Sequence, residues 1–222
     1  MNVFSVAKAH KIQRCLAKRI VFKSKLPAEI STVAGVDVAY AGSLAVGAAV
    51  VLNYQTLEIL ESQFAVCNVK MPYMPTLLSF RELPPSLLAI HKLKLEPDVF
   101  LVDAHGFAHP YRCGFASHLG VVIGRPTIGA AKSRLIGKAV EEDGKTGLFD
   151  NSEEIGAVVK TKVGAKPIFV SVGHMVSLTD ATRVVMHCSK SRIPEPLLKA
   201  HELATAQRDM IMLQDKVNIK EN

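Results

Sequence analysis

The stretch LVDAHGFAHPYRCGFASHLG, Leu101–Gly120, decides the fold that we expect for this chain. Apolar residues run into Asp103, which predicts a strand buried on both faces and ending at this acid. Gly106 and His109 follow, and a run of small and apolar residues carrying His118 then predicts a helix. A carboxylate at the end of a buried strand destabilises a protein unless a partner or a metal neutralises it. We therefore expect Asp103 to be half of a metal-binding carboxylate pair.

The second acid of the pair is expected in VAGVDVAY, residues 33–40, where valines flank Asp37. Alternation along a strand places Asp37 on one face together with Gly35 and Ala39. Two further apolar segments, AVGAAVVL and LEILESQFAV, follow after short turns, so the three predict an antiparallel meander. Because a buried carboxylate in mid-strand needs a partner, we favour a functional role for Asp37 over a structural one.

The remaining segments predict helices and further strands around this meander. Apolar spacing, prolines in first turns and a capping signal predict helices at residues 6–21, 84–94, 112–123, 177–188 and 193–209. Strands are expected at residues 126–130, 155–161 and 166–174, the last two as a hairpin. The charged residues 137–154 are expected to be mobile, and residues 211–222 to form a frayed tail. The fold class is therefore α/β, with a mixed sheet flanked by helices.

The composition is that of a soluble globular protein. With 222 residues, 49% of them hydrophobic and 21% charged, the chain suits one domain over residues 1–222, expected as a monomer. A net charge of +7 favours nucleic acid as partner, although a basic surface that only maintains solubility is an equal alternative. Four cysteines without paired spacing and no signal peptide indicate a reduced, cytoplasmic protein. No segment approaches the ~20 apolar residues of a membrane span.

A proline-rich segment, MPYMPTLLSFRELPPSL, is expected to form a stiff loop. Pro72 and Pro75 fix an extended backbone and hold Tyr73 and Met74 between them. A rigid aromatic side chain can stack on, or wedge beside, a nucleobase. A turn whose tyrosine only covers the core explains the same residues. The loop also leads to Glu82, a third acid.

Three acids from three separate elements, Asp37, Glu82 and Asp103, point to one kind of chemistry. Carboxylates without clustered Cys or His favour a hard cation such as Mg²⁺ or Mn²⁺ over zinc. Such a metal activates water and stabilises a leaving oxygen, as phosphodiester hydrolysis requires. Lys132, on a turn after a strand, could neutralise phosphate or orient water, or could simply be exposed. The roles open to the histidines are phosphate contact, ligand or general acid (His109, His118 and His201).

Six segments resemble the endonuclease V (deoxyinosine 3′ endonuclease) family, in the same order and at about the same spacing. They are VAGVDVAY, PYMPTLLSFRE, VDAHGFAHPYRCGFASHLG, PTIGAAKSRLIGK, PIFVSVGHMVSL and RIPEPLLKAHELA, and the similarity runs from Ile12 to His201. The resemblance implies a ribonuclease H-like fold. It also implies Mg²⁺-dependent nicking, with Mn²⁺ substituting, of inosine-containing DNA or RNA at the second phosphodiester bond 3′ to the deaminated base. The ends would be a 3′-hydroxyl and a 5′-phosphate.

The resemblance also implies roles for individual residues. Asp37 and Asp103 match the central metal ligands. Glu82 matches a third catalytic acid, and Lys132 and His201 match an active-site lysine and a residue of the C-terminal helix at the metal site. The residues matching the strand-separating wedge and its substrate contacts are Pro72, Tyr73, Met74, Pro75, Thr76, His109 and His118.

Three positions depart from the family pattern. Thr76 stands where the family usually has glycine after the wedge, and a Cβ there narrows the backbone conformations available beside the base. Ala104 replaces the usual glycine after Asp103, and Tyr111 replaces the usual basic residue after His109-Pro110. All the expected ligands are present, so we expect the protein to be active. We expect the three departures to affect its preference for the base more than its activity.

Two other functions remain open from the sequence. One is a non-catalytic binder of deaminated or branched nucleic acid with the same fold, which only Thr76 and Ala104 support. The other is a nuclease of broader structure specificity that acts on flaps or mismatches. A nucleotide-binding enzyme is disfavoured, because the sequence contains no GxxxxGK[ST] phosphate-binding loop.

Overall fold

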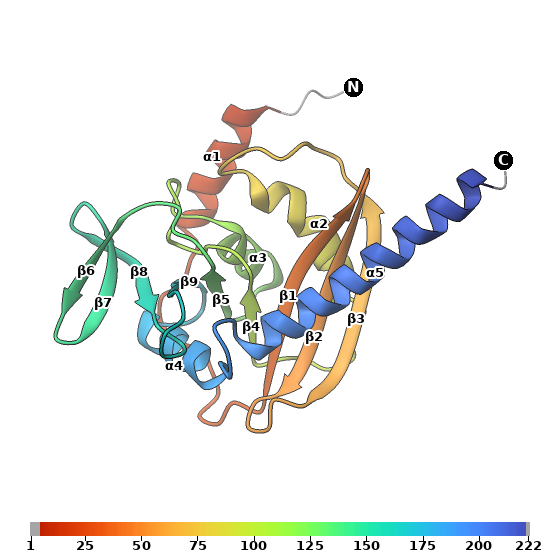
Figure 1. Cartoon of the computed structure of the whole chain (residues 1–222). Helices are drawn as coiled ribbons and strands as arrows, with labels where there is room; N and C mark the ends of the chain where they lie inside the picture. Colours follow the sequence, from red (N-terminus) through yellow and green to blue (C-terminus); the bar gives the residue numbers. More distant parts are fainter. Residues whose placement is uncertain (1–4, 221–222) are drawn as a thin grey trace.

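The computed structural model describes residues 5–220, with side chains described up to residue 214. Within this range one mixed sheet has nine strands in the order β3-β2-β1-β4-β5-β9-β8-β7-β6 (Figure 1). The strands are β1 (Thr32–Ala41), β2 (Leu44–Asn53), β3 (Ile59–Asn68), β4 (Val99–Val102), β5 (Thr127–Ala131), β6 (Lys138–Glu142), β7 (Lys145–Asp150), β8 (Glu153–Val159) and β9 (Ile168–His174).

The pairing confirms the expected mixture of strand directions. The first three strands form the predicted antiparallel meander. β4 then runs parallel to β1, and β5 runs parallel to β4. The expected hairpin of β8 and β9 is also present. Parallel strands end at the same edge of a sheet, so residues that follow β4 and β5 are brought together there.

Helices cover both faces of the sheet (Figure 1). They are α1 (Val6–Ala17), α2 (Leu78–Ile90), α3 (Phe115–Ile123), α4 (Leu178–His187) and α5 (Glu195–Lys220). Alternation along β4 shows the two layers, because Leu101 packs in one core cluster with Leu197 of α5 and with residues of α4. Its neighbour Phe100 packs in a separate cluster with Phe115 of α3 and residues of α2. β4 is buried on both faces, as its apolar sequence predicts.

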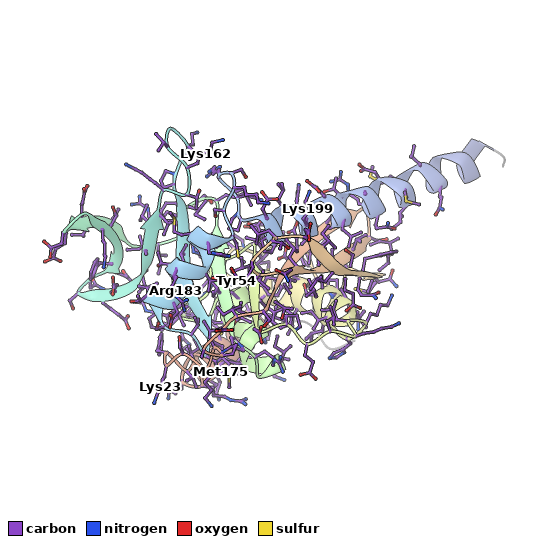
Figure 2. All side chains as sticks on the ribbon, turned by 90° about the horizontal axis from the view of Figure 1, so that it is seen from below. Lys23, Tyr54, Lys162, Met175, Arg183 and Lys199 are labelled. Carbon is purple, nitrogen blue, oxygen red and sulfur yellow. The ribbon has the colours of Figure 1, made fainter. Side chains whose placement is uncertain are left out.

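The β2–β3 turn reaches the helical layer formed by α4. Tyr54 stacks on His187 with ring centroids 4.1 Å apart, and His187 Nε2 is 2.7 Å from the Tyr54 carbonyl oxygen. Figure 2 shows Tyr54 close to Arg183 of α4. Ser177 caps α4 by accepting a hydrogen bond from the Asp180 backbone N–H at 3.1 Å, as the sequence predicts.

Two of the sequence-based expectations are wrong. Residues 137–154 are not an unstructured stretch, because β6 and β7 form a hairpin around Asp143 and Gly144. Both turn residues have positive φ, 49° and 72°, and Asp-Gly is a strong signal for such a turn. Helix α2 begins at Leu78, so Pro84 and Pro85 lie inside it rather than at its start. Packing of its apolar face against the sheet offsets the hydrogen bonds that the prolines cannot make.

Other helix boundaries differ from the predicted ones. Helix α1 ends at Ala17, and α3 starts at Phe115 after a residue with positive φ, Arg112. The predicted frayed tail is corrected for residues 211–220, which continue α5, whereas residues 221–222 lie outside the described residues. None of the described helices is long and apolar enough to cross a membrane.

Candidate active site

The register of β1 and β4 places the two predicted central acids side by side. Val36 is the partner of Val102 in this parallel pair, so the next residues along the strands are Asp37 and Asp103. The backbone N–H of Asp103 donates to the Val36 carbonyl at 3.4 Å, which continues the pairing past the end of β4. The side chains are mostly buried, with 14% of Asp37 and 13% of Asp103 exposed.

A cation lies beside one acid and a histidine beside the other. Lys132, in the turn after β5, donates to Asp103 Oδ2. His201 of α5 places Nδ1 2.8 Å from Asp37 Oδ2. The structure therefore brings together four of the five expected catalytic residues at the edge where β4 and β5 end.

Gly35 allows α5 to approach β1 closely enough for the His201 contact. A Cβ added to Gly35 would lie 1.8 Å from the carbonyl oxygen of Pro196. The backbones of strand and helix are thus in direct contact at Pro196, five residues before His201. Gly35 and Asp37 share one strand face, as alternation predicts, and this is the face that α5 covers.

Glu82 joins the site from the opposite helical layer. It lies on α2, not in the loop before a helix as the sequence suggested. Its Oε1 accepts a hydrogen bond from Tyr40 Oη at 3.3 Å, and the Arg81 guanidinium lies 4.1 Å from the centre of the Tyr40 ring. Burial, then the charges of Asp37 and Asp103, raises the pKa of Glu82 to about 8.

The site concentrates negative charge away from solvent. Burial raises the pKa of Asp37, the charge of Asp103 raises it further, and the hydrogen bond from His201 opposes both. The charge of Asp103 thus destabilises the ionised form of Asp37, and an added cation would relieve this repulsion. Carboxylate oxygens are the ligands of a hard cation such as Mg²⁺.

The number of ligands also fits a hydrated metal. Among the side chains that the structure describes, residues 5–214, no group of three or more His, Cys, Asp and Glu is arranged to hold a metal by itself. Mg²⁺ commonly takes only one or two carboxylates and fills its other positions with water and substrate phosphate. The pair Asp37 and Asp103 fits that pattern, while Glu82 and His201 stand beside it.

A cavity of about 340 Å³ opens next to Asp103. This volume is within the range of small-molecule pockets, about 300–1,000 Å³. The expected site residues that line it are Tyr73, Thr76, Asp103, His109 and Lys132. Pro72, Met74, Pro75 and His118 are not among the lining residues.

The proline-rich loop around Tyr73 carries its aromatic side chain on the surface. Tyr73 is 65% exposed and is one of the residues that line the cavity. Met74 instead packs with buried Met71 and Leu77. Thr76 has φ 68°, the left-handed conformation that glycine adopts without strain. The loop therefore keeps a glycine-like backbone although it lacks the glycine.

The two histidines expected near the substrate are buried in different places. His109 lines the cavity, and its Nδ1 accepts a hydrogen bond from the Tyr111 backbone N–H at 3.2 Å. His118 lies on α3, away from the cavity, edge-on to Phe80 at 5.2 Å. Burial lowers the pKa of each to about 4. Burial therefore favours the neutral form of both rings at neutral pH.

Sequence reasoning missed two residues that shape the site. His105 lines the cavity, and its Nε2 is 2.9 Å from the Ser133 carbonyl oxygen. Its position directly after Asp103-Ala104 was a signal that could have found it. Arg192 donates to the Lys132 carbonyl oxygen at 2.8 Å and so holds the turn that carries this lysine. No local pattern marks an arginine that binds a carbonyl group far along the chain.

A mixed sheet covered by helices on both faces, with one acid on β1 and one directly after β4, places the chain in the ribonuclease H-like class of nucleases. The family model described as Endonuclease V matches residues 14–202. An endonuclease V of Thermofilum pendens is 42% identical over 206 residues, which are 91% of this chain and 89% of that protein. The chain belongs to the endonuclease V family and is a nuclease, a hydrolase of phosphodiester bonds.

Solved structures agree with this assignment. Endonuclease V from Streptomyces avermitilis has a TM-score of 0.88 at 36% identity, covering 94% of this chain and 95% of that chain. Endonuclease V from Ciona intestinalis has a TM-score of 0.82 at 33% identity, covering 93% and 98%. That structure is a complex with DNA containing an inosine followed by a ribo-adenosine.

Proposed function

We propose that this enzyme nicks inosine-containing DNA or RNA at the second phosphodiester bond 3′ to the inosine. The reaction adds water across the P–O3′ bond and leaves a 3′-hydroxyl and a 5′-phosphate. The observation that carries the proposal is the position of the cavity, which shares Asp103 and Lys132 with the carboxylate site. A base held in the cavity thus keeps its own strand beside the acids.

The cavity suits a base that has left its stack. Enzymes that read a single altered base in a strand must expose it, and they commonly hold it in a closely fitting pocket. Tyr73 at the rim can fill the gap or separate the strands, while the backbone around Thr76 and Ala104 forms part of the wall. We assign Tyr73 and its prolines to the wedge, and Thr76 and His109 to the base cavity.

The residues of the carboxylate site divide the remaining tasks. Asp37 and Asp103 would hold Mg²⁺, with Mn²⁺ as a substitute, and the bound metal would supply an activated water and charge stabilisation for the leaving oxygen. Lys132 reaches the same place as Asp103 and can neutralise a phosphate oxygen. His201 fixes the orientation of the Asp37 carboxylate through its 2.8 Å contact. Glu82 can hold or release a proton beside both acids, because its pKa lies near neutral pH.

The test is a nicking assay on end-labelled DNA and RNA oligonucleotides with one inosine. We expect one nick, two phosphodiester bonds 3′ to the inosine, with Mg²⁺ or Mn²⁺ and none with a chelator. Oligonucleotides with adenosine in its place should stay intact. Asp103→Asn should abolish nicking, while the exposed control Asp209→Asn on α5 should cut like the parent. Nicking by Asp103→Asn at the parent rate would contradict the site assignment.

The same assay separates the other two functions. Binding of the inosine strand without a nick at any metal concentration would identify a non-catalytic binder. Equal cutting of inosine, mismatch and flap substrates at one concentration would identify a nuclease of broad structure specificity.

A further inference from the structure

Helix α1 holds the loop that forms one wall of the cavity. The long segment from β3 to α2 passes the helix (Figure 1), and Ala9 of α1 packs there in one cluster with Met71 and Leu77. Gln13, which is fully buried, donates from Nε2 to the Thr76 carbonyl oxygen at 2.8 Å. His10 places Nε2 3.3 Å from Thr76 Oγ1. Two side chains of α1 therefore bind one loop residue, through its backbone and its side chain.

Thr76 needs such support because its backbone is strained. A φ of 68° is the left-handed region, and for a β-branched residue this conformation is an outlier. Strained residues persist only where the surrounding structure over-determines them, and they cluster at functional sites. The Thr76 carbonyl is bound by Gln13 of α1, and the N–H of the same peptide, that of Leu77, donates to the Met74 carbonyl oxygen at 3.1 Å, so both edges of this peptide are held beside the cavity that Thr76 lines.

The same helix also contacts the segment between His109 and Gly114, two residues that line the cavity. The His10 ring stacks on Tyr111 with centroids 4.0 Å apart, and the Arg14 guanidinium lies 5.0 Å from the centre of that ring. Gln13 also donates to the Cys113 carbonyl oxygen at 3.1 Å. Thr76 and Tyr111, two positions that depart from the family pattern, are thus linked through α1.

The chemistry of Gln13 indicates why a polar residue occupies this place. Both hydrogen bonds leave from its Nε2, while its buried Oε1 has no hydrogen-bond partner among the described residues. A buried polar atom without a partner destabilises the fold, so an apolar side chain of similar size would serve packing better. What glutamine provides at position 13, and an apolar side chain would not, is the pair of hydrogen bonds that it donates. His10 and Gln13 also precede residues 14–202 that match the family model.

We infer that Gln13 and His10 are positioning residues that lock Thr76 in its left-handed conformation and thereby set the shape of the base cavity. The inference rests on the proposed function, because it assigns the cavity to the base. It makes α1 a determinant of base selectivity although neither side chain lines the cavity. A threonine at position 76 requires the contacts with Gln13 and His10 to keep its left-handed conformation, whereas a glycine there would not.

The first test compares Gln13→Met with the double variant Gln13→Met/Thr76→Gly. Methionine matches glutamine in size but donates no hydrogen bond, so the strained threonine can relax. We expect kcat/KM on inosine strands to fall about tenfold to a hundredfold, as displacement of a positioned group does, and discrimination against adenosine to fall with it. Thr76→Gly should restore both, since glycine holds the conformation unaided. Gln63→Met on β3, whose Nε2 donates to Glu61 at 3.1 Å, is the matched control and should behave like the parent.

The second test needs no substrate, so its failure is distinct from failure of the proposed function. Backbone hydrogen exchange of Tyr73, Met74, residue 76 and Leu77 should accelerate in Gln13→Met and return toward the parent rate in the double variant. Parent-like exchange and selectivity in Gln13→Met would overturn the inference. So would a double variant that stays as impaired as Gln13→Met, because the damage would then come from the helix rather than from Thr76.

Discussion

Gly35 of β1 and Pro196 of α5 touch through their backbones, with no room between them for a methyl group. This contact sets the distance between α5 and the sheet. It therefore also sets the position of His201 on α5, whose Nδ1 contacts Asp37 Oδ2. The position of His201, five residues after Pro196 on the same helix, thus depends on Gly35, two residues before Asp37 on β1. The site is built from packing as much as from the acidic side chains themselves.

The first prediction concerns this contact. Gly35→Ala should push α5 away from β1, lower the free energy of unfolding by about 1–3 kcal/mol and reduce nicking. Gly42→Ala is the matched control, because a Cβ there meets nothing within 4 Å although its φ is 55°. The control should lose some stability but keep nuclease activity. Denaturant unfolding and the nicking assay measure the two effects, and equal activity of both variants would contradict the role of the contact.

The second prediction concerns the buried third acid. In the unfolded chain Glu82 loses its proton near its ordinary pKa of 4.5, whereas in the folded protein it keeps the proton up to about 8. The metal-free protein should therefore lose stability as pH rises from about 4.5 to 8. Glu82→Gln removes this dependence and should raise the free energy of unfolding at pH 8 by about 3–5 kcal/mol, while abolishing nicking. Glu96→Gln, on an exposed carboxylate, should change neither property.

The third prediction concerns His118, whose contribution to stability changes with pH in the opposite direction to that of Glu82. Burial lowers the pKa of His118 to about 4 in the folded protein. Between about pH 6.5 and 4, His118 is therefore protonated in the unfolded chain but neutral in the folded protein. His118 thus favours the folded state above pH 6.5, and this contribution is lost as pH falls towards 4. His118→Phe keeps a ring against Phe80 and cannot bind the proton. Its stability should fall less between pH 7 and 4.5 than that of the parent, by up to about 3 kcal/mol.

Unfolding curves at the two pH values check this difference. His91→Gln, at the exposed end of α2, is the control and should follow the parent. A His118→Phe variant with the parent pH dependence would mean that His118 is already protonated, or never excluded from water, in the folded protein.

The fourth prediction concerns the arginine that holds the lysine turn. Arg192 donates to the carbonyl oxygens of Lys132 at 2.8 Å and Lys166 at 3.0 Å. Arg192→Met should let the turn move and lower kcat about tenfold to a hundredfold, with a smaller change in binding. Arg125→Met removes an arginine that also donates to a carbonyl oxygen, that of Pro97, but at the other end of the strands, and should leave kcat unchanged. A similar loss in both variants would show a general effect on stability instead.

The sequence predicted most of the architecture where local patterns are strong. The meander followed from alternation around Asp37, and the doubly buried β4 followed from its continuous apolar run. Errors arose where long-range packing outweighs a local signal. Pro84 and Pro85 normally mark a helix start, yet the apolar face of α2 continues the helix through them. The hairpin of β6 and β7 carried its own Asp-Gly signal, which high charge obscured.

The sequence by itself determined the set of chemical groups: acids at Asp37, Glu82 and Asp103, a lysine at Lys132 and an aromatic loop at Tyr73. Residue types and their order are written in the chain, so the family and the class of reaction could be inferred from them. Tertiary structure alone decided which groups meet. The register of Val36 with Val102 makes the two central acids neighbours, because a slip of one residue would turn one of them to the other face of the sheet.

Tertiary structure also decided what supports the site. Gln13 lies 63 residues from Thr76 and 100 residues from Cys113, and Arg192 lies 60 residues from Lys132. These contacts join side chains to backbone carbonyl groups, which every residue possesses. Because every residue has the same carbonyl group, the sequence cannot show which of them accepts a hydrogen bond. Only the folded backbone shows this.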